Sequence, residues 1–170
     1  MSHNTSFKNS THKALDKKLN DLVVDFYNVS LAYSDHSMNA ASSLEEYFRV
    51  RNSDCRDDLQ VRAVQDLNDI QATLRKTVSK MTKAIDNLKA MKTLGECDNS
   101  DSKLNNKIAK ANVVCNLLFK QMTEDFKVKC ELLEKAPLAF DAEGLMFVAY
   151  WRESFRTIQS FVDDIYALTF

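Results

Sequence analysis

Glycine and proline are nearly missing from this chain, which has two glycines and one proline in 170 residues. Average usage, about 7% and about 5%, would supply roughly 12 and roughly 8 of them. Barrels, sandwiches and doubly wound α/β folds need turn residues about every ten positions, and phosphate-binding loops need several glycines together. The scarcity therefore argues against those folds and leaves a small number of long helices.

Long hydrophobic runs are missing too, since the longest uninterrupted one covers only residues 145–151. A helix that crosses a bilayer needs about 20 predominantly apolar residues. The opening residues are polar and predict no export signal. The four cysteines show no CxxC spacing; they are Cys55, Cys97, Cys115 and Cys130. We therefore expect a cytoplasmic protein whose thiols are reduced.

An excess of charge of either sign is also lacking, because 23 basic and 24 acidic side chains give a net charge of −1. The chain as a whole has no electrostatic preference for nucleic acid, so any anion-binding surface must be local. With 45% hydrophobic residues the chain can still bury a core. These numbers describe an ordinary folded domain.

Candidate catalytic and metal-binding groups are few. The histidines, His3, His12 and His36, have no partner at metal-ligand spacing, and the Glu-x-x-His repeat of di-iron bundles is absent. Adjacent acidic pairs such as Asp163 and Asp164 point to different sides of a helix. We therefore expect no catalytic site, no metal and no cofactor, and we do not expect an enzyme.

The chain has, instead, apolar residues spaced alternately three and four apart over three long segments. This periodicity predicts helices that pack along apolar seams, over about 10–51, about 55–94 and from about 104 to Pro137. No proline interrupts the first two, and Gly95 is expected to end the second. Long helices joined by short polar loops predict antiparallel neighbours.

Pro137 decides how many helices the fold contains, because a proline kinks or ends a helix. The apolar seam resumes beyond Gly144. We expect an all-α fold of three long antiparallel helices, the last kinked near Pro137. A four-helix up-and-down bundle, with a true turn over residues 137–144, is the alternative. Residues 1–10 are expected to form a flexible tail and residues 11–170 a single domain.

The last helical segment carries large apolar residues off its main seam as well as on it. A helix that is apolar on two faces must bury both, and we expect the second face to pack against another copy of the chain in an isologous dimer. The residues expected at this homodimer interface are Phe147, Tyr150, Trp151, Phe155, Ile158 and Phe161.

Basic residues are concentrated between positions 75 and 110. Nine basic and four acidic residues give this segment +5, whereas 14 basic and 20 acidic residues give the remainder −6. An antiparallel hairpin brings them to one tip, where an anionic lipid surface attracts each by about 1 kcal/mol. The residues expected to bind membrane are Arg75, Lys76, Lys80, Lys83, Lys89, Lys92, Lys103, Lys107 and Lys110.

These lysines have two other interpretations, solvation of a helix face and nucleic-acid binding. They could simply solvate an exposed helix face, as lysines commonly do. Nucleic-acid binding is not expected, because no aromatic residues interleave the basic ones to stack on bases.

Two stretches resemble the BAR domain family, and come nearest to its Chibby-interacting members. One is residues 19–33, with Phe26 and Tyr33 one heptad apart; the other combines residues 121–127, 140–143 and 149–163. The resemblance implies an antiparallel dimer of kinked three-helix coiled coils whose tips and concave face bind curved anionic membrane. The basic set then supplies the membrane contacts. The chain departs from the family in being shorter and in lacking an amphipathic helix before the first seam.

Two functions therefore compete. The first is a dimeric module, peripheral at membranes, that senses or scaffolds curved anionic membranes through the tip between the second and third helices. The second is a non-enzymatic helical-bundle subunit of a larger coiled-coil assembly, with no role in lipid binding, whose seams are available to partner helices. The charge asymmetry favours the first.

Overall fold

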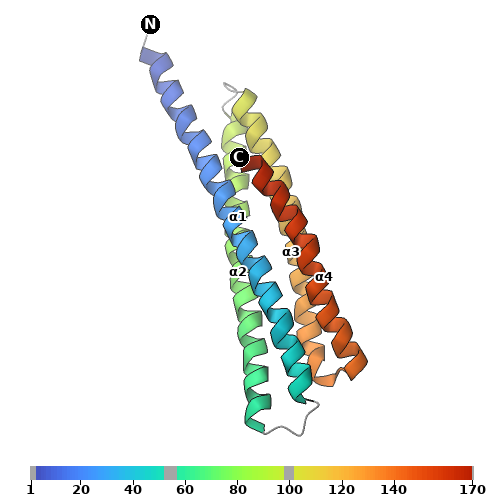
Figure 1. The fold of residues 1–170 in the computed structure, drawn as a ribbon. Helices are drawn as coiled ribbons and strands as arrows, with labels where there is room; N and C mark the ends of the chain where they lie inside the picture. Colours follow the sequence, from blue (N-terminus) through green and yellow to red (C-terminus); the bar gives the residue numbers. More distant parts are fainter. Residues whose placement is uncertain (1–2, 52–56, 98–101, 170) are drawn as a thin grey trace.

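The chain folds into four helices that alternate in direction. The computed structural model describes residues 3–51, 57–97 and 102–169, and this part is helical apart from a two-residue extended connection. Its elements are α1 (His3–Arg51), α2 (Asp57–Cys97), α3 (Ser102–Lys135), the short 3₁₀ helix η1 (Ala136–Leu138) and α4 (Asp141–Thr169). Each helix returns along the one before it (Figure 1). The expected all-α class is confirmed.

Pro137 separates two helices and does not kink one. α3 ends at Lys135, Ala139 adopts extended backbone, and α4 begins at Asp141 and runs back beside α3 (Figure 1). Proline has no N–H to donate and its ring disfavours helical backbone at the residue before it, so the α-helical ladder stops here. The expected single kinked helix is wrong, and the four-helix alternative describes the molecule.

Two helix boundaries also differ from expectation. α1 begins at His3, so the helix extends into the 1–10 segment that was expected as a tail. α2 continues through Gly95 to Cys97, although Gly95 was expected to end it. A glycine ends a helix by adopting the left-handed conformation, and none of the described glycines has a positive φ. Gly95 is therefore an ordinary helical residue here.

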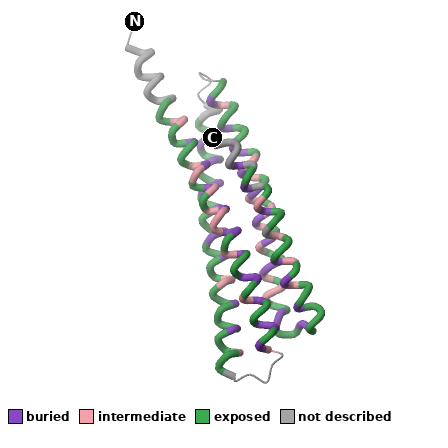
Figure 2. The backbone as a smooth tube through the Cα atoms, in the orientation of Figure 1, coloured by how far each residue is buried: buried purple, intermediate pink, exposed green. Residues whose placement is uncertain are grey.

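The core follows the seams, and that of α1 continues past His36 without a break. Small serines complete it, because Ser30 and Ser37 are fully buried at seam spacing between larger residues. The buried residues of this seam are Leu19, Val23, Phe26, Ser30, Tyr33, Ser37, Ala40, Leu44 and Tyr47. Figure 2 shows the buried residues recurring along the inward faces of the helices.

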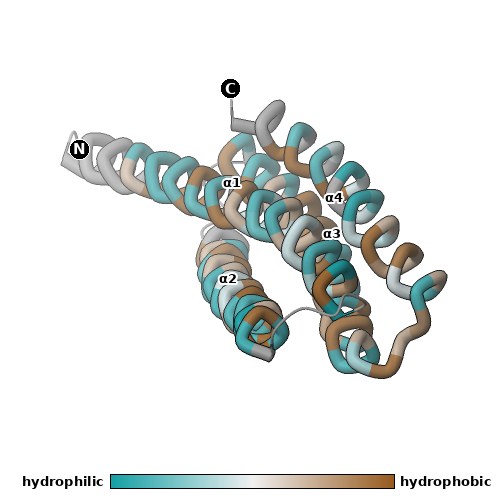
Figure 3. Tube along the Cα trace, turned by 60° about the horizontal axis from the view of Figure 1, so that its bottom comes forward, coloured by the Kyte–Doolittle hydropathy of each residue, from teal (hydrophilic) through white to brown (hydrophobic). Residues whose placement is uncertain are grey.

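α1 is the central helix of the bundle. It packs against both α2 and α4, while α3 packs against α2 and more loosely against α4 (Figure 3). Two ends of the bundle result: the α2–α3 hairpin lies at one, and the α3–α4 turn lies at the other, beside the end of α1 (Figure 1).

The α3–α4 turn is tied to α1 by Arg51. Its guanidinium donates hydrogen bonds to the carbonyl oxygens of Ala136 (2.8 Å) and Ala139 (2.6 Å). Ala136 O also accepts a hydrogen bond from the Ala139 backbone N–H at 3.4 Å, so Arg51 adds charge-assisted hydrogen bonds across the connection between α3 and α4. The Glu143 carboxylate accepts a hydrogen bond from the Phe140 backbone N–H (2.8 Å) and completes the start of α4.

Candidate functional site

The hairpin end of the bundle presents a basic surface. All nine basic residues predicted to bind membrane are exposed, and they lie on the second half of α2 and the first turns of α3 (Figure 1). Within residues 75–94 and 102–110, Asp86 is the one acidic side chain. We call these nine residues the basic end; they are Arg75, Lys76, Lys80, Lys83, Lys89, Lys92, Lys103, Lys107 and Lys110.

The charge changes sign along α2. The half that precedes the basic end contains Asp58, Asp66 and Asp69 with Arg62 as the one basic residue between positions 58 and 74. Both halves are equally solvent-facing, so a general need for solubility does not explain the separation. At the far side of the basic end, Lys107 Nζ forms an ion pair with Asp16 Oδ1 of α1 at 3.0 Å, which offsets part of one positive charge.

Exposed apolar side chains lie next to the basic residues. Val113 and Leu117 of α3 are 69% and 51% exposed, and Leu94 near the end of α2 is 60% exposed. Lys110, Val113 and Leu117 follow one another at helical spacing on the outer face of α3. Lysines beside exposed apolar side chains are typical of helices that lie in the headgroup region of a membrane.

The residues predicted at a dimer interface have different environments. Trp151 and Ile158 are buried within their own chain, at 0% and 3% exposure. Phe147 and Tyr150 are half-buried, and the Phe147 ring packs edge-to-face on Phe48 of α1 at 6.2 Å between centroids. The side chains of Phe155 and Phe161 lie outside the described residues. Trp151 and Ile158 thus belong to the core of the single chain.

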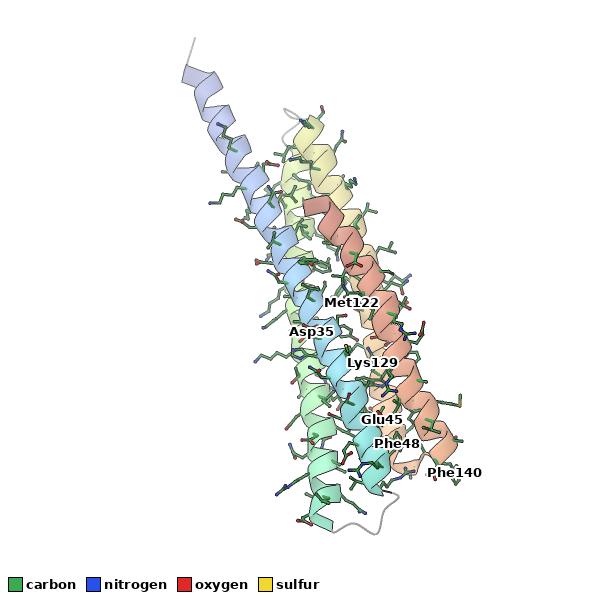
Figure 4. The ribbon with its side chains drawn as sticks, viewed as in Figure 1. Asp35, Glu45, Phe48, Met122, Lys129 and Phe140 are labelled. Carbon is green, nitrogen blue, oxygen red and sulfur yellow. The ribbon has the colours of Figure 1, made fainter. Side chains whose placement is uncertain are left out.

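A buried polar centre that the sequence analysis did not single out joins α1, α3 and α4. Lys129 is fully buried, and its Nζ forms an ion pair with Asp125 Oδ2 at 2.5 Å and donates to Ser37 Oγ at 3.0 Å. Tyr33 donates to Asp125 Oδ2 at 2.7 Å. The Lys129 ammonium also lies 5.1 Å from the ring centroids of both Tyr33 and Trp151. Figure 4 shows Lys129 directed into the bundle.

Burial dominates the electrostatics of this centre. It lowers the pKa of Lys129, which the Asp125 carboxylate partly counteracts. Burial and the charge of Asp125 raise the pKa of Tyr33, and in the same way raise that of Tyr150 to about 12. The ammonium is therefore held by a carboxylate, a hydroxyl and two aromatic faces, which together replace the water that it loses.

The sequence did contain a signal for this centre. Asp125 and Lys129 continue the three-and-four spacing of the α3 seam after Met122, so both fall on core positions of the heptad. Opposite charges four residues apart on a buried face indicate a paired ion bridge. The predicted seam instead followed the apolar residues Phe126 and Leu133, which lie on the neighbouring side of α3.

Three further features bear on catalysis or ligand binding: a groove, a buried thiol and the distribution of metal-binding side chains. A groove of about 340 Å³ lies between α3 and α4, with Asp125 and Tyr150 among its lining residues. Burial raises the pKa of the Cys115 thiol to about 12, so this thiol is protonated at neutral pH and is a poor nucleophile. Within the part of the chain that the structure describes, no group of three or more His, Cys, Asp or Glu residues could hold a metal ion.

The opposite end of the bundle exposes large apolar side chains. Leu138 and Phe140 in the turn are 85% and 78% exposed, and Leu145 and Met146 in the first turns of α4 are 72% and 70% exposed. We call these four residues the apolar end. Figure 4 shows Phe140 at the extremity of the bundle. Patches of this kind on an ordered surface mark contact sites.

The chain matches no protein-family model, and no curated protein and no solved structure is significantly similar to it. The resemblance to the BAR family therefore stays a prediction. Across residues 3–51, 57–97 and 102–169, no helix combines the length and the hydrophobicity needed to cross a bilayer. The exposed surfaces of the molecule are therefore what bears on its function.

Proposed function

We propose that this chain is a non-enzymatic helical module that associates peripherally with anionic membranes through its basic end. The observation that carries the proposal is the set of nine exposed basic side chains, against four acidic residues between positions 75 and 110. Each basic residue near a membrane surface contributes about 1 kcal/mol, so several acting together give measurable binding. The exposed Val113 and Leu117 can add apolar contact at the same surface.

The length of the basic surface favours side-on contact. The stretch of α2 from Arg75 to Lys92 is about 25 Å long at 1.5 Å per residue, and the first turns of α3 lie beside it. A charged surface that extends over two antiparallel helices matches a membrane surface better than it matches a narrow pocket. This favours a membrane over a small anionic ligand.

Vesicle co-sedimentation tests the proposal. We expect the full chain to bind vesicles that contain phosphatidylserine, and to be released at about 1 M salt, where the Debye length falls to about 3 Å. The test variant carries glutamine at five positions of the basic end: Lys76, Lys80, Lys83, Lys103 and Lys107. At about 1 kcal/mol each, its affinity should fall by at least a hundredfold.

A matched variant controls for net charge. It carries glutamine at five exposed basic residues away from the hairpin end: Arg62, Lys120, Lys127, Lys135 and Arg156. It loses the same five charges, so it should keep most of the binding if position matters. Equal losses in the two variants, or no binding by the unaltered chain, would contradict a membrane-binding end.

Curvature sensing rests on the resemblance to the BAR family. Small sonicated and large extruded vesicles of one lipid composition test it, and stronger binding to the small vesicles is the expected result. Equal binding would remove the curvature preference and leave the membrane association intact.

The second candidate function is that of an interaction module with no lipid role, and the apolar end favours it. Four large apolar side chains 70–85% exposed at an anchored turn provide a surface for contact with protein. The same vesicle experiment decides between the two functions. A folded chain that binds no anionic vesicle at low salt would support the interaction module.

A further inference from the structure

The apolar end continues as an unpartnered face along the start of α4. Ala142, Leu145, Met146 and Ala149 are all exposed and follow one another at helical spacing. They lie on the side of α4 opposite the buried Val148 and Trp151. In Figure 3 the hydrophobic colouring of the turn and the first turns of α4 lies on the outside of the bundle. The sequence analysis placed a dimer contact on α4, but on residues that the structure in part buries.

This face is held in one conformation before anything binds. Arg51 fixes the turn through two carbonyl oxygens, and the side chain of Glu143 fixes the first turn of α4. Gly144 lets α4 approach α1 closely, because a Cβ there would lie 2.8 Å from the Phe48 ring. A contact surface that is already ordered loses little entropy on binding.

A groove of about 350 Å³ adjoins the face. It is lined by Phe48, Gly144, Leu145 and Val148 together with the charged residues Glu45, Arg49 and Asp141. The groove gives room for an apolar side chain of an incoming helix. The groove therefore places a concave site beside the apolar side chains that project from α4.

We propose that a second copy of this chain occupies the face, with the two α4 helices antiparallel around a twofold axis near Leu145 and Met146. Charge complementarity along α4 supports this occupant. Asp141 and Arg152 are eleven residues, or about three turns, apart, so they lie on the same flank of α4 on either side of the axis. Antiparallel pairing brings Arg152 of one copy beside Asp141 of the other, twice in the dimer.

The existing partners of these charges do not oppose this pairing. Arg152 pairs with Glu45 at 2.6 Å and Asp141 with Arg51 at 3.7 Å, and the Arg152, Glu45 and Asp141 side chains are more than half exposed. Exposed ion pairs rearrange at little cost. An anionic membrane fits this face poorly, since the carboxylates of Asp141 and Glu143 border the apolar residues.

The area fits a modest dimer. Leu138, Phe140, Leu145 and Met146 from each copy, with the alanines between them, would bury on the order of 1,000 Å² in total. This is near the lower limit for a specific interface, so we expect a dissociation constant in the micromolar range. The interface is independent of the basic end, so failure of vesicle binding would leave it standing.

Light scattering on the full chain over a range of concentrations tests the proposal. The mass should rise toward twice 19.4 kDa as the concentration increases. The paired substitution Leu145→Glu and Met146→Glu should hold it at 19.4 kDa. The matched control is Val113→Glu and Leu117→Glu on the outer face of α3, which should still dimerise. Circular dichroism checks that both variants remain helical.

A charge exchange tests the antiparallel geometry. Asp141→Arg and Arg152→Glu should each weaken the dimer, by at least threefold in dissociation constant, and the two together in one chain should restore it. A chain that stays monomeric at every concentration, or a dimer that survives the Leu145 and Met146 substitutions, would overturn the proposal. Failure of the double exchange to restore a weakened dimer would overturn the antiparallel pairing.

Discussion

The two ends of this bundle differ in what they bury and what they expose. At the hairpin end the core is apolar, with Met81, Ile85, Leu88 and Ile108 buried, and the surface is basic. Toward the turn the core holds the charged pair Asp125–Lys129. The surface at that end exposes Leu138, Phe140, Leu145 and Met146 instead.

The difference separates two ways of using the same heptad pattern. An apolar seam supplies stability but tolerates shifts between helices, whereas a buried ion pair is satisfied in one arrangement only. The hairpin half carries many like charges on its surface over a mostly apolar core, whose buried polar side chains include Asn112, which donates to Leu88 O and Ile108 O, and Thr77, which donates to Thr73 O. The turn half has fixed geometry, as a contact surface requires.

Breaking the buried ion pair should have the largest effect. Lys129→Met leaves the Asp125 carboxylate buried without its ammonium partner, which typically costs about 3–5 kcal/mol. Urea unfolding followed by circular dichroism measures the loss. Adding Asp125→Leu and Tyr33→Phe to the same chain removes the orphaned charge together with the buried hydroxyl that donates to it, and should recover most of the stability. A loss below about 1 kcal/mol in the single variant would show that water solvates the carboxylate and that the turn half has no special dependence on this pair.

Removing Arg51 should come next. Arg51→Met deletes two charge-assisted hydrogen bonds to Ala136 and Ala139, and the Arg51 side chain is only 23% exposed, so we expect a loss of about 2 kcal/mol. The matched control is Arg49→Met, where an exposed pair with Glu46 is lost and about 0.5 kcal/mol is expected. Similar losses in the two variants would mean that the turn is not anchored by Arg51.

Gly144→Ala probes the close approach of α1 and α4 at the apolar end. The new Cβ would lie 2.8–2.9 Å from atoms of the Phe48 ring, and overpacking costs typically about 1–3 kcal/mol. Alanine gains up to about 1 kcal/mol in helix propensity, so we expect a net loss of about 1 kcal/mol. In a Phe48→Leu background the same substitution should become neutral or stabilising. A stabilised Gly144→Ala in the unaltered chain would show that Phe48 moves aside freely.

The sequence predicted the helices well and the buried centre not at all. Alternating three-and-four spacing located α1, α2 and α3 because burial of an apolar stripe repeats with the turn of the helix. Pro137 also indicated a break in the third helix, but the sequence did not show whether the chain kinks or reverses direction there. Whether a chain kinks or reverses depends on distant anchors such as Arg51, which binds carbonyls 85 and 88 residues away.

Among the predicted site residues, some environments could likewise be predicted from the local sequence and others could not. Exposure of the nine basic residues follows from their positions between seam residues, so it could be predicted locally. The environments of Trp151 and Ile158 could not, because their burial depends on α4 returning along α1. Lys129 was overlooked because lysine is rarely buried unless its charge is paired. Its ion-pair partner Asp125 is only four residues away, but Ser37 and the Tyr33 ring, which complete its surroundings, lie more than 90 residues away in the sequence.

The smallest expected effect is on the alkaline side of the stability profile, and it concerns the turn half alone. Burial and Asp125 raise the pKa of Tyr33 above its ordinary 10.0. Such a group stabilises fully below its unfolded pKa, and that stability is lost as the pH rises above about 10. Lys129, whose pKa burial lowers from 10.5, acts in the opposite direction up to that pH, because the unfolded chain then binds more protons.

We therefore expect the free energy of unfolding to begin to fall above about pH 9, where the buried Cys115 thiol, whose pKa is raised to about 12, loses its contribution. It should fall further above about pH 10, and this further fall should be shallower in Tyr33→Phe. Urea unfolding at a series of pH values from about 8 to about 11 measures both slopes. The lysines of the basic end lose their charge in the same range, but both proteins share them, so the difference between the slopes isolates Tyr33. Identical slopes would mean that Tyr33 reaches solvent before the bundle unfolds, and that the buried centre opens locally while the hairpin half stays closed.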